Sequence, residues 1–217
     1  MRTKLHRQHL GQISPFLLQP GDVLYNAIAG QRWSSFFHND HPITVELACG
    51  RGEYTTGLAK VFPRHNFIGV DIKGDRLGHG LQDQQRDHLT NVGFLRTIIH
   101  HLTHFFHPGE VDELRLVHPD PRPKLHDARR RLSHPRFLSL YRQILKSDWL
   151  LHFKTDDHDL YHFTLQSLTN SWRTIIAQTN DLYASPLLAY HHHIVTHYES
   201  LGLIAWSTIC YLQAKMI

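Results

Sequence analysis

The residues best suited to chemistry lie in a proline-rich stretch, residues 116–132, where an acid stands beside a basic cluster. Asp120 lies between Pro119 and Pro121. Proline fixes its own φ and keeps the preceding residue out of helix, so the Asp120 carboxylate is carried on a stiff backbone. Five cations follow it: Arg122, Lys124, Arg129, Arg130 and Arg131. A solvated surface loop would explain such a run by itself. A rigid acid beside dense positive charge also suits a site for an anionic molecule.

A second group of residues follows the apolar segment Ile43–Leu47. Gly50 and Gly52 come directly after it, and Asp71 ends the next apolar segment about twenty residues later. A glycine turn between a strand and a helix allows close backbone approach and presents helix amides to a ligand. An acid at the end of the second strand can accept hydrogen bonds from a ribose. These features suit either a dinucleotide or S-adenosylmethionine.

Two residues decide between these ligands. The dinucleotide fingerprint requires a third glycine, and Thr55 stands at that position. Glu46 points from the strand at the same turn, where it would repel a pyrophosphate but would attract the cationic amino acid end of S-adenosylmethionine. The pattern therefore favours S-adenosylmethionine, although a structural role for Glu46 remains the alternative.

The hydrophobic pattern indicates the elements that position these residues. Helices are expected at 54–62, 73–87, 135–145 and 157–168, and strands at 43–47, 66–70, 91–96, 113–117, 149–154, 172–178 and 203–212. Strands separated by helices predict an α/β fold with a doubly wound, mostly parallel, seven-stranded sheet. Ligands bind at the carboxyl ends of such strands. The glycine turn, Asp71, Asp120 and Thr155-Asp156 all fall there.

Length and composition limit the remaining possibilities. The 217 residues predict one domain at 41–217, preceded by a basic arm at 1–40 that docks on the domain or on a ligand. No apolar run reaches the roughly 18 residues of a membrane helix. Two cysteines make no disulfide framework and fit a reducing cytoplasm. The net charge of +4 favours an anionic partner, and the 21 histidines are interpreted as surface basic residues, so no metal site is expected.

Several separated segments resemble the bacterial tRNA (guanine-N(7)-)-methyltransferases, from about residue 40 to the end. The segments are Val45–Tyr54, Phe67–Lys73, Pro119–Pro121 with the arginine run, His152–Asp156 and Thr196–Glu199. Pro-Asp-Pro, Lys-Thr-Asp and Thr-x-Tyr-Glu in this order are specific, whereas the glycines alone are not. The resemblance implies a class I, Rossmann-like methyltransferase fold. It also implies that S-adenosylmethionine methylates the seven-position nitrogen of a guanine in the tRNA variable loop, without a metal.

The resemblance also implies a role for each matching residue. Those expected to bind the cofactor are Glu46, Gly50, Gly52, Asp71 and Asp120, with Asp120 also the active-site acid. Those expected to contact tRNA are Lys124, Arg130, Arg131, Asp156, Thr196, Tyr198 and Glu199. Asp156 or Glu199 would accept hydrogen bonds from the Watson–Crick edge of the guanine. A monomer and a homodimer both remain open.

The chain departs from the family pattern at three places. Ile98 stands where another cofactor acid is usual, His118 where an aromatic residue often precedes Pro-Asp-Pro, and Leu125-His126 where the family is more basic. The missing acid leaves an alternative open, a non-catalytic RNA-binding protein on a methyltransferase scaffold. A dinucleotide-dependent oxidoreductase is disfavoured by the incomplete glycine fingerprint and by the arginine loop.

Overall fold

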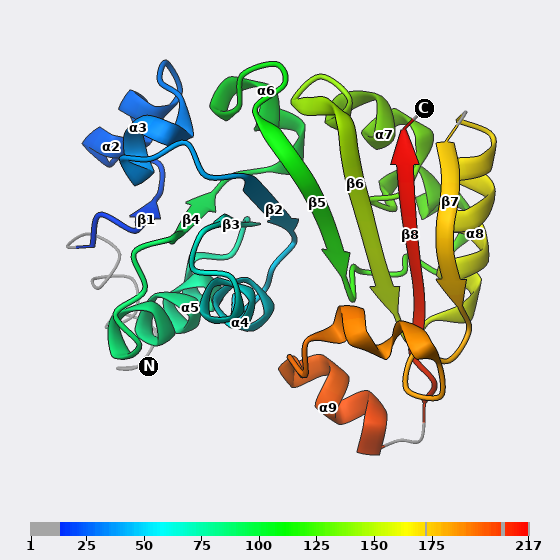
Figure 1. Ribbon diagram of the computed structural model, residues 1–217. Helices are drawn as coiled ribbons and strands as arrows, with labels where there is room; N and C mark the ends of the chain where they lie inside the picture. The colour runs from blue at the N-terminus through cyan, green and yellow to red at the C-terminus, as the bar shows by residue number, and fades with distance from the viewer. Residues whose placement is uncertain (1–13, 172, 205–206, 217) are drawn as a thin grey trace.

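A computed structural model describes residues 14–171, 173–204 and 207–216, which form one eight-stranded sheet with helices on both faces (Figure 1). The strand order is β1-β4-β3-β2-β5-β6-β8-β7. β1 to β6 run parallel, and β8 runs antiparallel to both of its neighbours. The strands are β1 (Leu17–Leu18), β2 (Ile43–Leu47), β3 (Asn66–Asp71), β4 (Val92–Arg96), β5 (Val111–Val117), β6 (Leu145–Thr155), β7 (Arg173–Thr179) and β8 (Cys210–Met216).

Most of the helices connect these strands, whereas one short helix, α9 (His197–Ile204), lies beside the strand ends (Figure 1). The α-helices are α2 (Val23–Ile28), α3 (Trp33–Phe37), α4 (Glu53–Val61), α5 (Gly74–Arg86), α6 (Leu102–Phe105), α7 (Pro135–Tyr141), α8 (His158–Thr169) and α9 (His197–Ile204). The described residues also form the 3-10 helices η1 (Ile99–His101), η2 (Leu125–Arg130) and η3 (Pro186–His191). α9 lies beyond the carboxyl ends of β5 and β6 (Figure 1). Among the described helices, none combines the length and the apolar character that crossing a bilayer requires.

The predicted α/β fold with a mostly parallel, doubly wound sheet is confirmed, but the expected seven strands are eight. The additional strand, β1, has two residues and pairs with β4 at the sheet edge, too short to leave a periodic pattern. The expected strand at 203–212 is wrong at its start, because α9 extends to Ile204 and β8 begins at Cys210. β8 lies between two strands and is buried along most of its described length, so its apolar and polar residues hardly alternate.

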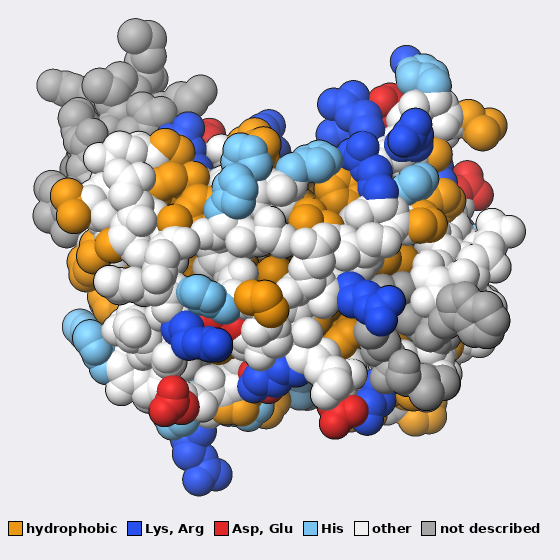
Figure 2. Space-filling model, turned by 90° about the horizontal axis from the view of Figure 1, so that it is seen from above, with side chains coloured by type: hydrophobic (Ala, Val, Ile, Leu, Met, Phe, Trp, Pro, Cys, Tyr) orange, Lys and Arg blue, Asp and Glu red, His pale blue; other side chains and the backbone are white. Residues whose placement is uncertain are grey.

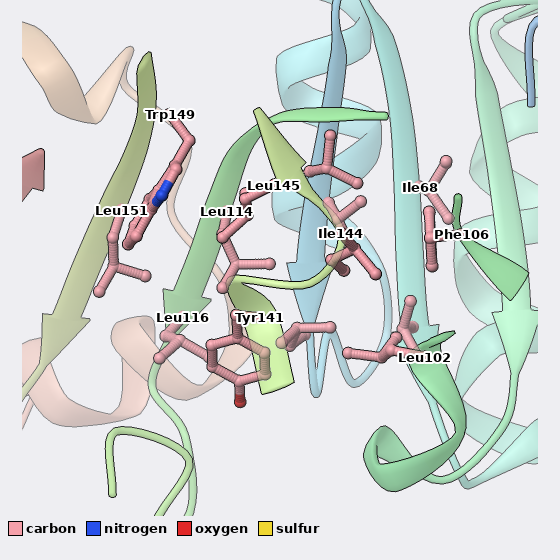
Figure 3. Packing of buried hydrophobic residues seen from close by; sticks show 14 of the residues in the cluster. Ile68, Leu102, Phe106, Leu114, Leu116, Tyr141, Ile144, Leu145, Trp149 and Leu151 are labelled. Atoms are coloured by element: carbon pink, nitrogen blue, oxygen red, sulfur yellow. The ribbon is translucent and has the colours of Figure 1, made fainter. Parts of the chain in front are cut away.

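Alternate residues of the central strands point to opposite faces of the sheet, and each face has its own apolar cluster. On β3, Phe67 packs in the cluster that contains Leu58 of α4 and Leu77 of α5. Ile68 packs in the larger cluster on the other face, with Tyr141 of α7 and Trp149 of β6. Figure 3 shows side chains of this larger cluster, including Leu114 and Leu116 of β5 and Leu151 of β6. The two clusters hold the helices against the sheet and so place the strand ends.

The described part of the expected N-terminal arm is packed into the domain core. Trp33 is fully buried, and its ring stacks on Phe106 at 5.5 Å between centroids. Its backbone N–H donates to the buried Glu110 carboxylate at 2.6 Å, and its indole N–H donates to the Phe105 carbonyl at 2.8 Å. The segment around Trp33 therefore stabilises the ends of the neighbouring loops. Residues 1–13, the most basic part of the expected arm, lie outside the described residues, so that part stays a prediction.

We expect Trp33→Ala to lower the free energy of unfolding by roughly 3–5 kcal/mol, because it removes a fully buried ring and the hydrogen bond that the indole N–H donates to the Phe105 carbonyl. Val23→Ala in α2 is the matched control. Because Val23 is 84% exposed, this substitution should change the free energy of unfolding by less than about 0.5 kcal/mol. Urea unfolding monitored by circular dichroism measures both. Equal stability of the two variants would show that the segment is not docked.

Candidate active site

The turn between β2 and α4 is built on three left-handed residues. Ala48, Gly50 and Gly52 have φ of 56°, 57° and 72°. Gly52 is required by packing, since a Cβ there would lie 2.5 Å from Cε1 of Phe94 and 3.3 Å from Cα of Gly80. Gly50 instead faces a cavity, and its N–H donates to Asp71 Oδ2 at 3.0 Å. The two glycines that the sequence groups together thus have different roles.

Asp71 ends β3 with its carboxylate beside this turn. The second oxygen, Oδ1, accepts the N–H of Lys73 at 2.8 Å, and the residue is 8% exposed. An ionised carboxylate has about four acceptor positions, so hydrogen-bonding capacity remains on each oxygen. Asp71 therefore both fixes the turn and presents an acceptor to a ligand.

Two cavities meet at this turn and share Ala48 and Asp71 in their walls. The larger, about 300 Å³, has a mixed lining with many polar and charged residues, among them Glu46, Glu53, Asp71, Arg76, His118, Asp120, Thr196 and Tyr198, together with Gly50 of the turn. The smaller, about 210 Å³, is largely apolar, with Val70, Ile72, Ile98, Ile99, Leu132 and Phe137 among its residues. The turn therefore separates a cavity with many charged groups from an apolar slot.

Glu46 is the most deeply buried acid of the larger cavity, at 3% exposure. Its Oε2 accepts the hydroxyl hydrogen of Thr55. Burial raises the pKa of Glu46 to about 7, against the opposing effects of the Thr55 hydrogen bond and the charges of Lys154 and Arg115. A cationic ligand in this cavity would favour the ionised carboxylate.

The Asp120 carboxylate stands at the mouth of the same cavity, with 61% of its side chain exposed. Its Oδ1 accepts the N–H of Arg122 at 3.2 Å, and its Oδ2 lies 3.0 Å from the Arg122 guanidinium. Arg131 cross-links the loop from beneath: Nε donates to the Pro121 carbonyl at 3.1 Å and Nη2 to the Arg122 carbonyl at 3.2 Å. Its guanidinium also lies 4.5 Å from the centroid of the Phe163 ring. These contacts hold the loop that carries Asp120.

His118 joins the end of β5 to the end of β6. It has a φ of 46°, and its N–H donates to the Lys154 carbonyl at 2.8 Å. Its Nδ1 lies 3.2 Å from Oδ1 of Asp156. That hydrogen bond outweighs burial and lowers the pKa of Asp156, so the carboxylate is ionised and Nδ1 carries the proton.

α9 covers the glycine turn from the other side. Tyr198, 47% exposed, lies with Cε2 3.9 Å from the position of a Cβ at Gly50. The N–H of His197 donates to Glu53 Oε2 at the start of α4, at 2.8 Å. Glu199 is fully buried and forms an ion pair with Lys154, with 2.8 Å between Oε2 and Nζ. The tyrosine faces the cavity, whereas the glutamate faces the protein interior.

The structure brings half of the residues expected from the sequence to the larger cavity: Glu46, Gly50, Asp71, Asp120, Thr196 and Tyr198. The other six are absent from its lining: Gly52, Lys124, Arg130, Arg131, Asp156 and Glu199. Glu53 and Arg76 also line it, although neither was expected as a site residue: Glu53 lies within the matching segment Val45–Tyr54, whereas Arg76 lies outside every matching segment. Ile98, at the position of the missing acid, is 40% exposed on the wall of the apolar slot. Within the described residues, no three His, Cys, Asp or Glu side chains are grouped so that they could hold a metal ion.

Comparison with known proteins identifies the family. A family model described as "Putative methyltransferase" matches residues 40–208. The chain is 42% identical to the tRNA (guanine-N(7)-)-methyltransferase of Cytophaga hutchinsonii, over 100% of this chain and 98% of that protein. It is 44% identical to the enzyme of the same name from Porphyromonas gingivalis, over 84% of this chain and 75% of that protein. The chain belongs to the tRNA (guanine-N(7)-)-methyltransferase family.

Solved structures with a similar fold are more distant in sequence. An antibiotic-related methyltransferase aligns with a TM-score of 0.59 at 15% identity, covering 91% of this chain and 96% of that one. A SAM-dependent methyltransferase from Aquifex aeolicus aligns with a TM-score of 0.55 at 10% identity, covering 99% and 98%. These structures support the class I methyltransferase fold. The tRNA (guanine-N(7)-)-methyltransferase family recognised from the Pro-Asp-Pro, Lys-Thr-Asp and Thr-x-Tyr-Glu segments is confirmed.

We expect Glu46→Gln to increase stability more at pH 8 than at pH 5. The pKa of Glu46 is about 7 in the folded protein, against an ordinary 4.5. Stability contributed by the protonated carboxyl is fully present below pH 4.5 and is lost as the pH rises to about 7. Glutamine cannot ionise and avoids this loss, which amounts to at most about 3 kcal/mol. Urea unfolding of both proteins at the two pH values measures the difference. A gain that does not change with pH would contradict the burial of an ionisable Glu46.

Proposed function

We propose that this protein transfers a methyl group from S-adenosylmethionine to the seven-position nitrogen of a guanine in the variable loop of tRNA. The observation that carries the proposal is that the residues expected to bind the cofactor and the acid of the Pro-Asp-Pro loop line the same cavity. Glu46 and Asp71 line it from β2 and β3, Gly50 from the turn after β2, and Asp120 from the loop after β5. A methyl donor and an acceptor base can therefore meet at Asp120.

The residues present fit S-adenosylmethionine. Glu46 would hold the cationic amino group, Asp71 the ribose hydroxyls, and the apolar slot beside Ile98 the adenine. When bound, the cofactor supplies an electrophilic methyl group on a sulfonium. The absence of an acid at Ile98 removes one polar contact from the slot but leaves its apolar walls in place. This supports catalysis over the alternative of a non-catalytic RNA-binding protein, as do the enzymatic names of the relatives.

Methyl transfer to this nitrogen requires no acid–base catalysis by the protein. The seven-position nitrogen of guanine has an in-plane lone pair and is unprotonated at neutral pH, so no general base is required. The protein must align the base with the methyl group and hold it there. Methylation leaves the purine cationic, and the carboxylate of Asp120 would stabilise this developing charge.

Affinity for tRNA would come from cations around the Pro-Asp-Pro loop. Lys124, Arg129 and Arg130 are exposed on or next to η2, where they can reach phosphates. Figure 2, viewed from the end opposite α9, shows Lys and Arg side chains gathered on a projecting part of the surface beside a hollow. The target base would be drawn out of its stack, which costs least in a loop. A tRNA substrate agrees with the proposed cytoplasmic location.

The proposal is tested by incubating the protein with labelled S-adenosylmethionine and unmodified tRNA, followed by nucleoside analysis. We expect 7-methylguanosine from the native protein. Asp120→Asn should lower kcat by roughly 10- to 1,000-fold, because it removes charge that acts on the transition state. The same substitution should change the Kd for tRNA by less than about threefold. Methyl transfer at the native rate by Asp120→Asn would show that Asp120 takes no part in catalysis. A product other than 7-methylguanosine would overturn the proposed function.

Two adjacent arginines should give different kinetic defects. Among the described residues, the exposed side chain of Arg130 bonds only to Asp127, whereas Arg131 binds the loop carbonyls and contacts the Phe163 ring. We expect Arg130→Ala to weaken tRNA binding and to reduce the slope of log K against log salt by about one. Arg131→Ala should instead lower kcat and leave that slope nearly unchanged. Equal slopes for Arg130→Ala and the native protein would show that Arg130 makes no phosphate contact.

A further inference from the structure

The segment Thr196-His197-Tyr198-Glu199 forms a reciprocal cap at the start of α9. The hydroxyl oxygen of Thr196 accepts the N–H of Glu199 at 3.2 Å, and Oε2 of Glu199 accepts the N–H of Thr196 at 3.4 Å. This is the capping box, in which a threonine and a glutamate three residues later satisfy each other's backbone donors. Folding of the helix alone therefore explains why threonine and glutamate occur at this spacing.

The Glu199 carboxylate is saturated by protein groups. Oε2 also accepts from Lys154 Nζ at 2.8 Å, and Oε1 accepts from His191 Nε2 at 2.9 Å and from the Tyr183 hydroxyl at 3.1 Å. Burial would raise the pKa of Glu199, but the bonds from His191 and Lys154 lower it to about 2. The acid is ionised, fully buried and absent from the cavity lining. A base in the cavity finds no vacant acceptor on it.

Lys154 extends this network towards the cofactor side of the site. It is 3% exposed at the carboxyl end of β6, and its Nζ lies 4.7 Å from the centroid of the Tyr54 ring. Its charge also favours ionisation of Glu46, which lines the cavity. The lysine thus interacts with both Glu46, the acid expected to bind the cofactor, and Glu199, the acid in the first turn of α9.

We infer that Lys154 and Glu199 are positioning residues, which seat α9 so that the Tyr198 ring lies over the glycine turn. The inference rests on the proposed function and changes the role expected for one of its residues. Glu199 then does not accept hydrogen bonds from the Watson–Crick edge of the guanine. Tyr198 is the residue of this segment that contacts the ligands. The N–H of His197 on Glu53 provides a second attachment of α9.

A double-mutant cycle tests the inference. Removing one member of a buried ion pair leaves the other charge uncompensated, whereas removing both is often nearly neutral. We therefore expect Lys154→Met and Glu199→Gln each to lower kcat/KM for tRNA methylation by at least about tenfold. The double variant should recover to within about threefold of the native protein, because glutamine can keep the capping geometry. A double variant as impaired as Glu199→Gln would overturn the inference in favour of direct base contact.

A pair of substitutions at Thr196 provides the matched control for the cap. Thr196→Ser keeps the hydroxyl that accepts from Glu199, so it should lose less activity than Thr196→Ala, which should be nearly as impaired as Lys154→Met or Glu199→Gln. Thermal unfolding identifies any variant that fails to fold. Equal activity of the serine and alanine variants would show that the cap does not position Tyr198.

Cofactor affinity separates failure of this inference from failure of the proposed function. Calorimetry with S-adenosylhomocysteine should show weaker binding to Lys154→Met and recovery in the double variant, whether or not tRNA is methylated. If the native protein forms no 7-methylguanosine, the function fails, and the pattern of affinities still decides the inference. If the native protein is active but neither activity nor affinity recovers in the double variant, only the inference fails.

Discussion

Parallel pairing of β3, β2, β5 and β6 is the constraint on which the rest of the structure depends. Because these strands run in one direction, their carboxyl ends meet at one edge of the sheet. Asp71 ends β3, and the segment that follows β5 carries Asp120. Residues separated by more than a hundred positions in sequence, such as Glu46 and Lys154, approach one another only through this pairing. The helices on each face then fix the strands without occupying the edge.

The same edge concentrates charge in places that water hardly reaches. Arg115 pairs with Glu113 and donates to the Tyr54 hydroxyl, while Lys154 pairs with Glu199. Each buried cation has an acid partner, as its desolvation requires. Burial raises the pKa of Glu46 to about 7, because the hydrogen bonds from Thr55 and the charges of Lys154 and Arg115 offset only part of its desolvation. A cavity wall with one under-compensated acid is suited to a cationic ligand.

Much of the fold and part of the site follow from local sequence patterns. Ile43–Leu47, Asn66–Asp71 and the glycine turn were recognisable because short apolar runs and glycines record local requirements of backbone and burial. β1 was not, since two residues carry no period. The capping box at Thr196 and Glu199 has a readable signature, a threonine followed three residues later by a glutamate, which was interpreted only as a substrate contact.

The sequence by itself determined the class of fold, the family and the position of the glycine turn, because these depend on motifs whose parts are close together in the chain. Only the tertiary structure decided which side chains of the same chemical type make different contacts and so have different roles. Arg130 and Arg131 are chemically identical neighbours, yet Arg131 alone reaches the carbonyls of Pro121 and Arg122 and the ring of Phe163. Glu199 and Asp120 are both acids, yet Glu199 is buried in an ion pair with Lys154, whereas Asp120 lies at the mouth of the cavity. These differences arise from contacts between distant segments, which no local pattern records.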